Sequence, residues 1–497
     1  MKSIFKAEYI EEPILIFGDS NPSPDPKLGL SLFGPYSWTK TAINIGIIGS
    51  KKTVEQTRYL LKDLSNIILG DPKYPKWRLD FPGISRNNIF KTRLINLEKW
   101  NQVLLSNEIK FITEYTKENE IISNAVDLFI EKICILKERE EVPDLIICSP
   151  PKEIIDSCVA VSDEGPEFKW RFKRSASQQT LLDYMPDYRD TILEELSRKS
   201  ASNFHHRLKA MSMDLKMPTQ MIKPTTLDAY TNPELGGIQH KSVLAWNLCV
   251  GLLYKAGARL WKPRLMPQGT CYVGISFYKE KTVFGSLIGT SLVHVFTPDG
   301  DGLVLKGERF DWPRRGSPHL SMKGAKKILE QSLELYKQHT RSIPSRVVIH
   351  KSSSFWDEEK EGFLSALHNV PLYDFITITP NQKSIRFFRT GYNPVMRGTM
   401  IILPDDTCLL YTKGYVPQTE IYAGPRIPLP LEISQQMGES TIDKICREIL
   451  ALTKLNWNTS DFSIFYPITL HFSAQVGSIL KEIPPGITPQ TKYLYYM

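Results

Sequence analysis

The chain has 497 residues, of which 41% are hydrophobic and 23% are charged, and its formal net charge is +8. These values are ordinary for a globular chain of two or three domains and argue against a wholly disordered protein. No run of 18 or more apolar residues occurs, which excludes a conventional membrane-spanning helix.

The seven cysteines are scattered and include no Cys-x-x-Cys pair. We therefore expect no disulfide framework, no structural zinc site, and a reducing cytoplasmic location. The first residues turn acidic before a signal-peptide core can form, so no signal peptide is expected. Residues 261–497 hold 27 Lys and Arg against 21 Asp and Glu, and this surplus fits either a polyanionic partner or a solvated basic surface.

The first half of the chain has an α/β pattern. Short apolar runs predict buried strands at 14–17, 45–48 and 144–148, and an amphipathic pattern predicts a helix over 53–69. The polar stretch 162–200 is interpreted as a loop-rich insertion, and further helices are expected near 201–212 and 240–256.

The second half has a different order of elements. Strands are expected over 271–278, 283–295 and 303–310, then a helix over 323–339, a strand over 346–350 and a helix over 356–367. Three strands, a helix, a strand and a helix are the order of a ribonuclease-H-like domain. A hairpin is expected at 399–403 and 408–411 around Asp405 and Asp406, followed by a helix over 440–455 with Ser440 as its N-cap. We place the domain boundary after residue 262, which gives domains 1–262 and 263–497.

A group of polar residues in the first half has a spacing suited to a terminal phosphate. His205 and Lys209 are four residues apart and share one helical face, and Asn247 and Lys255, eight apart, share another. Gln220 follows the first pair after a loop. Lysines supply positive charge, while amide and imidazole groups supply directional hydrogen bonds. Each residue alone is most simply a surface or helix residue, but the ordered set predicts a phosphate pocket.

This set resembles the MID-domain pocket of Argonaute proteins, which holds the 5′ phosphate of a guide strand. Five residues match the pattern of the family, namely His205, Lys209, Gln220, Asn247 and Lys255. Gly251 departs from it, because many relatives carry a further Lys at that place. The resemblance also implies that the carboxylate of Met497 enters the pocket and helps to hold Mg²⁺ against the guide phosphate.

The resemblance further implies that the second half is a PIWI domain, a ribonuclease-H-like nuclease that needs clustered carboxylates to hold two metal ions. It places the first two carboxylates at Ser276 and Ser352, and the last metal ligand at Ala474 or Gln475. Serine cannot replace a carboxylate at Mg²⁺, and Lys351 brings a positive charge beside the site. We therefore expect no target cleavage.

The resemblance includes segments 29–35 and 307–310 and covers most of the chain. It points to a catalytically inactive short prokaryotic Argonaute, with a Rossmann-like MID domain before a ribonuclease-H-like PIWI domain and no space for the N and PAZ domains of longer relatives. It implies a guide RNA, a complementary target DNA, and an APAZ-containing effector subunit that is a TIR or sirtuin-like NADase. The expected heterodimer can oligomerise on target binding and acts in defence against phages and plasmids.

Two other enzyme classes fail on their motifs. Residues 14–20 resemble the strand and Gly-Asp-Ser nucleophile of an esterase, but no His in the chain follows an Asp at the required spacing of three. Residues 46–52 resemble a phosphate-binding loop, but their glycines are too close together, so a strand-to-helix turn is expected.

Two alternatives stay closer to the main prediction. An active nuclease of the same fold would need other carboxylates, for which Asp299 and Asp301 are candidates in a turn. A stand-alone nucleic-acid-binding protein would have no effector subunit, and a co-purified second chain would exclude it.

Overall fold

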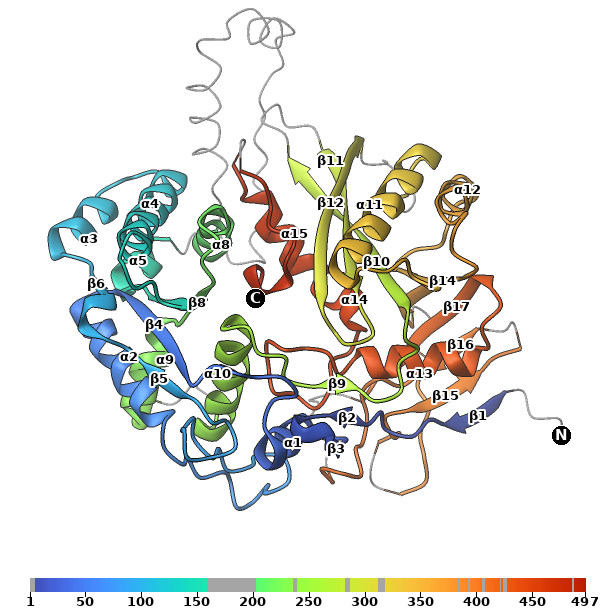
Figure 1. Cartoon of the computed structure of the whole chain (residues 1–497), viewed down its shortest axis with the longest axis horizontal. Helices are drawn as coiled ribbons and strands as arrows, with labels where there is room; N and C mark the ends of the chain where they lie inside the picture. The colour runs from blue at the N-terminus through green and yellow to red at the C-terminus, as the bar shows by residue number, and fades with distance from the viewer. Residues whose placement is uncertain are drawn as a thin grey trace, which may run out of the picture.

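The computed structural model describes residues 5–158, 203–235, 239–281, 287–311, 318–381, 385–391, 394–404, 407–420, 422, 427–484 and 487–497 (Figure 1). The predicted insertion at 162–200, the turn at 405–406 and the start of the strand predicted at 283–295 lie outside these residues. No helix within the described ranges is long and apolar enough to cross a membrane.

The first half is built on a parallel sheet in the order β5–β4–β7–β8, with β6 also paired to β4. Its strands are β4 (Ala42–Gly49), β5 (Arg93–Ile95), β6 (Asn101–Val103), β7 (Leu145–Ser149) and β8 (Thr219–Met221). The central strands β4 and β7 are apolar along almost their whole length because helices cover both faces of the sheet.

Two groups of helices cover this sheet, as Figure 1 shows. One group is α2 (Lys51–Asp63), α9 (Pro224–Thr231) and α10 (Lys241–Lys255); the other is α3 (Ser106–Thr113), α4 (Glu118–Lys137), α5 (Lys152–Ser157) and α8 (Phe204–Asp214). Ile45 and Ile47 of β4 pack in the same cluster as α2 and α10, whereas Ile48 packs in the cluster of α4 and α8. A parallel sheet between two helical layers confirms the predicted Rossmann-like arrangement.

The strands predicted at 45–48 and 144–148 and the helix predicted at 240–256 are confirmed. The helix predicted over 53–69 was too long, because α2 ends at Asp63. The chain then leaves the helix and Ile68 pairs with Phe81 in an isolated bridge, which leaves Ile67 and Leu69 about 70% exposed. The strand-to-helix turn predicted for residues 46–52 is confirmed, since β4 ends at Gly49 and Ser50 caps α2 directly after it.

The second half is built on a nine-stranded mixed sheet in the order β1–β15–β16–β17–β14–β13–β10–β11–β12. Five of its strands are β10 (Thr270–Lys281), β11 (Leu287–Phe296), β12 (Gly302–Asp311), β13 (Arg346–Lys351) and β14 (Leu372–Pro380). β10, β11 and β12 form an antiparallel meander, and β13 and β14 run parallel to β10. Helix α11 (Met322–Thr340) comes before β13 in the sequence and α12 (Asp357–Ala366) comes after it, and the two helices pack against each other. The predicted ribonuclease-H-like order is confirmed.

The remaining strands of this sheet come from both ends of the chain. They are β1 (Lys6–Tyr9), β15 (Thr399–Ile402), β16 (Cys408–Leu410) and β17 (Leu431–Gly438). The hairpin of β15 and β16 was predicted, and β1 adds to it antiparallel at the edge. α13 (Ile442–Leu452) begins after Thr441, not after the predicted cap Ser440, because the Ser440 hydroxyl donates to Asp374 instead.

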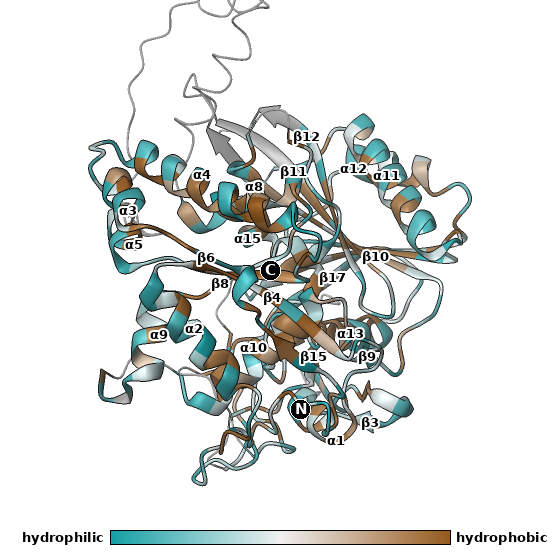
Figure 2. Cartoon of the chain, turned by 60° about the vertical axis from the view of Figure 1, so that its left-hand side comes forward, coloured by the Kyte–Doolittle hydropathy of each residue, from teal (hydrophilic) through white to brown (hydrophobic). Residues whose placement is uncertain are grey.

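A small sheet and a common core join the halves. β2 (Leu15–Ile16) pairs with β3 (Pro22–Ser23) and with β9 (Lys262–Pro263), where the chain passes from the first half to the second. One buried cluster includes Ile47, Trp246, Tyr272 and Tyr496, so residues of both halves pack together. In Figure 2 the strands in the middle of the molecule are mainly hydrophobic, while outer helices such as α2 and α11 carry hydrophilic stretches. The division at residue 262 stays a prediction.

Candidate phosphate-binding site

Helix α8 carries the first predicted pair and buries its lysine. Asn203 caps the helix by accepting a hydrogen bond from the His206 amide at 3.0 Å, which fixes where the helical turns begin. Lys209 is only 3% exposed, and its ammonium donates to the Thr219 carbonyl at 3.2 Å and to the main-chain oxygen of Met497. Lys209 therefore connects the first half of the chain to the last residue of the sequence.

Helix α10 supplies the second lysine. Lys255 lies in its last turn, is 4% exposed, and donates to the side-chain oxygen of Gln220 on β8. The amide nitrogen of Gln220 donates to the Met221 carbonyl at 3.0 Å, which orients its oxygen toward the lysine. At Gly251, one turn earlier, an added Cβ would lie 3.8 Å from the Gln220 side-chain oxygen, so the backbone leaves space there.

The electrostatics of this group favour an anion. Burial lowers the pKa of Lys209 to about 8, and burial together with Lys209 places the pKa of Lys255 well below its ordinary value. Burial, followed by the charges of Lys209 and of its neighbours, also places the pKa of His205 well below its ordinary value. Three groups that gain a positive charge on protonation thus converge where water is scarce, so a bound anion would stabilise their protonated forms.

A further lysine lies at the edge of the site. Lys223, which sequence reasoning missed, is exposed at the start of α9 and lies close enough to His205 to lower its pKa. It follows Gln220 by three residues, directly after β8, and that position is the signal that could have found it.

Asn247 is placed differently from the other predicted residues. Its side-chain oxygen accepts hydrogen bonds from the amide and the hydroxyl of Ser460, both at 2.9 Å, and its nitrogen donates to Gln239 at 3.2 Å. These contacts join α10 to a loop of the second half. The structure therefore brings together His205, Lys209, Gln220, Lys255 and Met497, while Asn247 lies on the same helix as Lys255 with its polar atoms bonded elsewhere.

The last residues of the sequence pack into the protein. Tyr496 and Met497 are 1% and 6% exposed, and Tyr493 is also buried. The Tyr496 hydroxyl donates to the Gln490 carbonyl at 2.7 Å, and the Tyr495 hydroxyl donates to the Lys216 carbonyl beyond α8 at 3.3 Å. This packing holds the Met497 main-chain oxygen beside Lys209.

The two predicted catalytic positions lie near each other in the chain path of the second half. Ile275 and Lys351 are the last registered pair of the parallel strands β10 and β13; Ser276 is the next residue of β10, and Ser352 comes directly after the end of β13. Ser276 is 7% exposed and its hydroxyl has no hydrogen-bond partner among the described residues, whereas Ser352 is exposed. Ala474 and Gln475 lie at the start of α15 (Ser473–Lys481), which packs on β10. Within the described ranges, no three His, Cys, Asp or Glu side chains are grouped to hold a metal ion.

One expectation for this region was wrong. Lys351 does not present a free charge beside Ser352, because its ammonium is buried in an ion pair with Glu359 of α12. Its ammonium is fully buried and binds both oxygens of Glu359, at 2.7 and 2.6 Å, and the Ser354 carbonyl at 3.0 Å. The charge of Lys351 is therefore neutralised inside the protein.

Asp299 and Asp301, the candidate carboxylates of an active nuclease, lie near the beginning of β10, whereas Ser276 lies farther along that strand. Asp299 pairs with Lys262 at 3.2 Å, and Asp301 pairs with Arg259 and with His339. Their turn joins β11 to β12 beside the beginning of β10, four residues before Ser276 in the register. Four strand residues correspond to about 13 Å, so these carboxylates cannot meet at Ser276.

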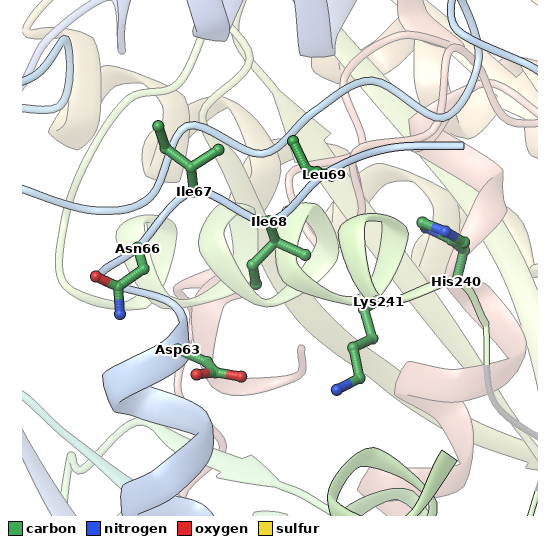
Figure 3. A pocket seen from close by; sticks show the side chains of 7 residues that line it. All are labelled: Asp63, Asn66, Ile67, Ile68, Leu69, His240 and Lys241. Atoms are coloured by element: carbon green, nitrogen blue, oxygen red, sulfur yellow. The ribbon is translucent and has the colours of Figure 1, made fainter. Parts of the chain in front are cut away.

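A separate pocket of about 560 Å³ opens near the first turn of α10, at the opposite end of that helix from Lys255. Figure 3 shows its lining residues, which are Asp63, Asn66, Ile67, Ile68, Leu69, His240 and Lys241. The Tyr230 hydroxyl donates to Asp63 at 3.1 Å, and the ammonium of Lys241 lies 4.6 Å from the Tyr230 ring. None of the predicted site residues lines this pocket.

The sequence matches no family model and no curated protein. The structure is similar to that of Clostridium butyricum Argonaute bound to a guide DNA and a 19-mer target DNA, with a TM-score of 0.64, 16% identity, and coverage of 97% of this chain and 54% of that chain. It is also similar to Aquifex aeolicus Argonaute (TM-score 0.54, 16% identity, coverage 100% and 56%) and to Drosophila Piwi (0.57, 15%, 99% and 56%). The chain spans just over half the length of these neighbours. It has the fold of Argonaute and Piwi proteins, in which a Rossmann-like MID part is followed by a ribonuclease-H-like PIWI part.

Proposed function

We propose that this chain binds the 5′-phosphorylated end of a guide strand at Lys209, Lys255, Gln220 and His205, and uses the guide to capture a complementary strand. The observation that carries the proposal is the pair of buried lysines. Among the described residues, neither Lys209 nor Lys255 forms an ion pair with a carboxylate side chain, although both are almost fully buried. A buried cation without a counterion is costly, and in the described part of the chain Lys255 contacts only the neutral amide of Gln220. A phosphate dianion would supply the counterion of Lys255 and add an anion beside Lys209, which already contacts the main-chain oxygen of Met497.

The guide is proposed to be RNA and the target DNA, as the resemblance to short prokaryotic Argonautes implies. The basic second half would follow the backbone of the paired strands through charge and shape, while base pairing reads the sequence. The Clostridium butyricum neighbour holds a guide DNA and a target DNA, which supports the capture of two paired strands on this fold.

Mg²⁺ is proposed as the accompanying ion. The main-chain oxygen of Met497 lies beside Lys209, and oxygen atoms of carboxylate and phosphate are the ligands that Mg²⁺ prefers. The Met497 carboxylate and the guide phosphate would hold the ion, and its charge would offset the repulsion between these two anions. Lys209 would keep the carboxylate in place.

We also propose that the chain does not cut its target and signals through a second protein. Serines stand at both positions where the resemblance places the first two metal-binding carboxylates. The chain spans 54% to 56% of the length of its structural neighbours. By resemblance this subunit contains an APAZ region with a TIR or sirtuin-like NADase, and target binding activates it against phages or plasmids in the cytoplasm.

The experiment that tests the pocket compares two chemical ends of one guide. The double variant Lys209→Ala with Lys255→Ala should weaken binding of a 5′-phosphorylated guide by at least about tenfold, and binding of the same guide with a 5′ hydroxyl much less. Lys110→Ala, an exposed lysine on α3, serves as the control and should change neither affinity. An equal loss for both guides would show that the lysines do not bind the terminal phosphate.

A further inference from the structure

The outer edge of β1 is an open strand edge with an apolar face. β1 ends the order of the nine-stranded sheet, and Figure 1 shows it at the margin of the molecule, close to the N-terminus. On its inner side β1 pairs with β15, where Lys6 lies opposite Ile402 and Tyr9 opposite Thr399. An open edge of this kind is a template for pairing with another strand.

The hydrogen-bonding groups that remain on this edge can be assigned from the register. The Ile10 amide donates to the Gly398 carbonyl at 2.9 Å, so the backbone groups of Ile10 point inward. Because these groups alternate along an antiparallel strand, those of Glu8 and Lys6 also point inward, and those of Ala7 and Tyr9 point to the open side. No backbone hydrogen bond reaches Ala7 or Tyr9 on that side from the part of the chain that the structure describes.

The side chains divide between the two faces of the strand. Phe5, Ala7 and Tyr9 share one face and are exposed, with 41% exposure for Phe5 and 43% for Tyr9. Phe5 packs edge-on against Phe387, with 5.2 Å between the ring centroids. Lys6 and Glu8 share the other face, where they form an ion pair within the strand.

We propose that β1 pairs with β1 of a second copy of this chain, antiparallel and centred on Ala7. In that register Ala7 faces Ala7 of the second copy and Phe5 faces Tyr9, so the backbone groups that point outward meet each other. Lys6 then lies opposite Glu8 of the second copy, and Glu8 opposite its Lys6, so both cross-strand pairs join opposite charges. This self-complementarity of charge, apolar face and hydrogen-bond pattern favours a second copy over a foreign strand, and it produces the two-fold interface usual for dimers.

The pairing would join two nine-stranded sheets into one continuous sheet. Because β1 has only four residues, the dimer should be weak and concentration-dependent. The inference does not rest on the proposed guide binding, since no residue of β1 belongs to the phosphate site, and Figure 1 shows β1 at the margin of the molecule and the C-terminus near its middle.

Reversing the charge of Lys6 or of Glu8 tests the proposed register, and analytical ultracentrifugation of the full chain measures its association. The wild type should form a concentration-dependent dimer. Lys6→Glu alone or Glu8→Lys alone converts both cross-strand pairs into like charges and should raise the dimer dissociation constant about tenfold or more. Mixing the two single variants should restore association, because the two acidic side chains of one variant then face the two basic side chains of the other. The double variant K6E/E8K should also associate. Lys326→Glu on α11 is the control and should leave the dimer unchanged.

Cross-linking provides the second measurement. Ala7→Cys should give a dimer with a short bismaleimide, whereas the wild type and Ala474→Cys, at an exposed position on α15, should not. A chain that stays monomeric up to its solubility limit, or a dimer that ignores both charge reversals, would overturn the proposal. Cross-linking of Ala7→Cys to a different, co-purified protein would also overturn it, in favour of a foreign strand on β1.

Discussion

Lys209 donates a hydrogen bond to the main-chain oxygen of Met497, although the two residues are 288 positions apart in the sequence. The contact is buried and joins a helix of the MID part to the last residue of the PIWI part. The candidate phosphate site is therefore formed only when both halves of the chain are folded together.

A short extension after Met497 tests the role of this contact. Adding Gly-Ser-Gly would remove the carboxylate from its place beside Lys209. We expect weaker binding of 5′-phosphorylated guide and loss of its dependence on Mg²⁺, while binding of 5′-hydroxyl guide changes little. Filter binding with Mg²⁺ and with EDTA measures both. If EDTA has no effect on the unextended chain, the proposed Mg²⁺ is not part of the site.

The affinity for a 5′-phosphorylated guide should depend on pH in the alkaline range. Burial lowers the pKa of free Lys209 to about 8, and a bound phosphate raises it, so binding is coupled to proton uptake. The contribution of Lys209 is then complete below its free pKa and is lost as the pH rises toward the pKa of the bound state, by up to about tenfold per pH unit for one proton.

The control for this pH dependence is Lys209→Arg, because arginine stays protonated throughout the range. Its phosphate affinity should fall less steeply above pH 8. Titration of guide binding at several pH values, with a 5′-hydroxyl guide beside it, separates the pocket from general effects on nucleic-acid binding. A flat profile for the wild type would contradict the assignment of Lys209.

Glu12→Gln should destabilise the protein strongly. Glu12 accepts hydrogen bonds from Arg397 at 2.9 Å and from Lys454 at 2.8 Å, and all three are buried. Replacing the carboxylate leaves two buried cations without their anion, so the free energy of unfolding should fall by about 3–5 kcal/mol. Glu11→Gln, at the exposed neighbouring position, should change it by less than about 0.5 kcal/mol in the same denaturant titration.

The same carboxylate should contribute to acid unfolding. Burial alone would raise the pKa of Glu12, but Arg397 and Lys454 hold it below the ordinary value. Its contribution to stability is therefore present above the pKa of the unfolded chain and is lost as the pH falls through the folded pKa. Glu12→Gln should accordingly flatten the dependence of stability on pH below about pH 5.

The chain should not cut a labelled complementary strand in the presence of Mg²⁺ or Mn²⁺. Serines at positions 276 and 352 offer no carboxylates for a pair of metal ions, and no other described carboxylates gather there. Ser276→Ala with Ser352→Ala should leave target binding unchanged. Cutting opposite the middle of the guide would show that metal ligands from elsewhere complete the site.

Much of the fold could be predicted because its central strands are apolar along their length. Continuous apolar runs predicted β4, β7 and β13, and the order of elements from β10 to α12 predicted the ribonuclease-H-like sheet. β1 could not be predicted, since Lys6–Tyr9 is polar and becomes a strand only through its pairing with β15, almost 400 residues away.

The site shows the same division between local and distant contacts. The face shared by His205 and Lys209 follows from helical spacing alone, whereas the burial of Lys209 is seen only in the structure. The bonds of Asn247 to Ser460 and of Lys351 to Glu359 depend on how distant segments pack, which spacing cannot show. For the same reason the N-cap of α13 is Thr441 and not the predicted Ser440, since the Ser440 hydroxyl donates to Asp374 on β14.

Each half of the molecule contains a piece of the other. The N-terminal strand β1 pairs with β15 in the sheet of the second half, and the C-terminal residue Met497 contacts Lys209 of the first half. Both ends of the chain therefore hold the two halves together. Cutting the chain at residue 262 would separate β1 from its partner strand β15 and Met497 from Lys209. An affinity tag after Met497, or a circular permutant that joins Met497 to the N-terminus, would remove the terminal carboxylate from its place beside Lys209.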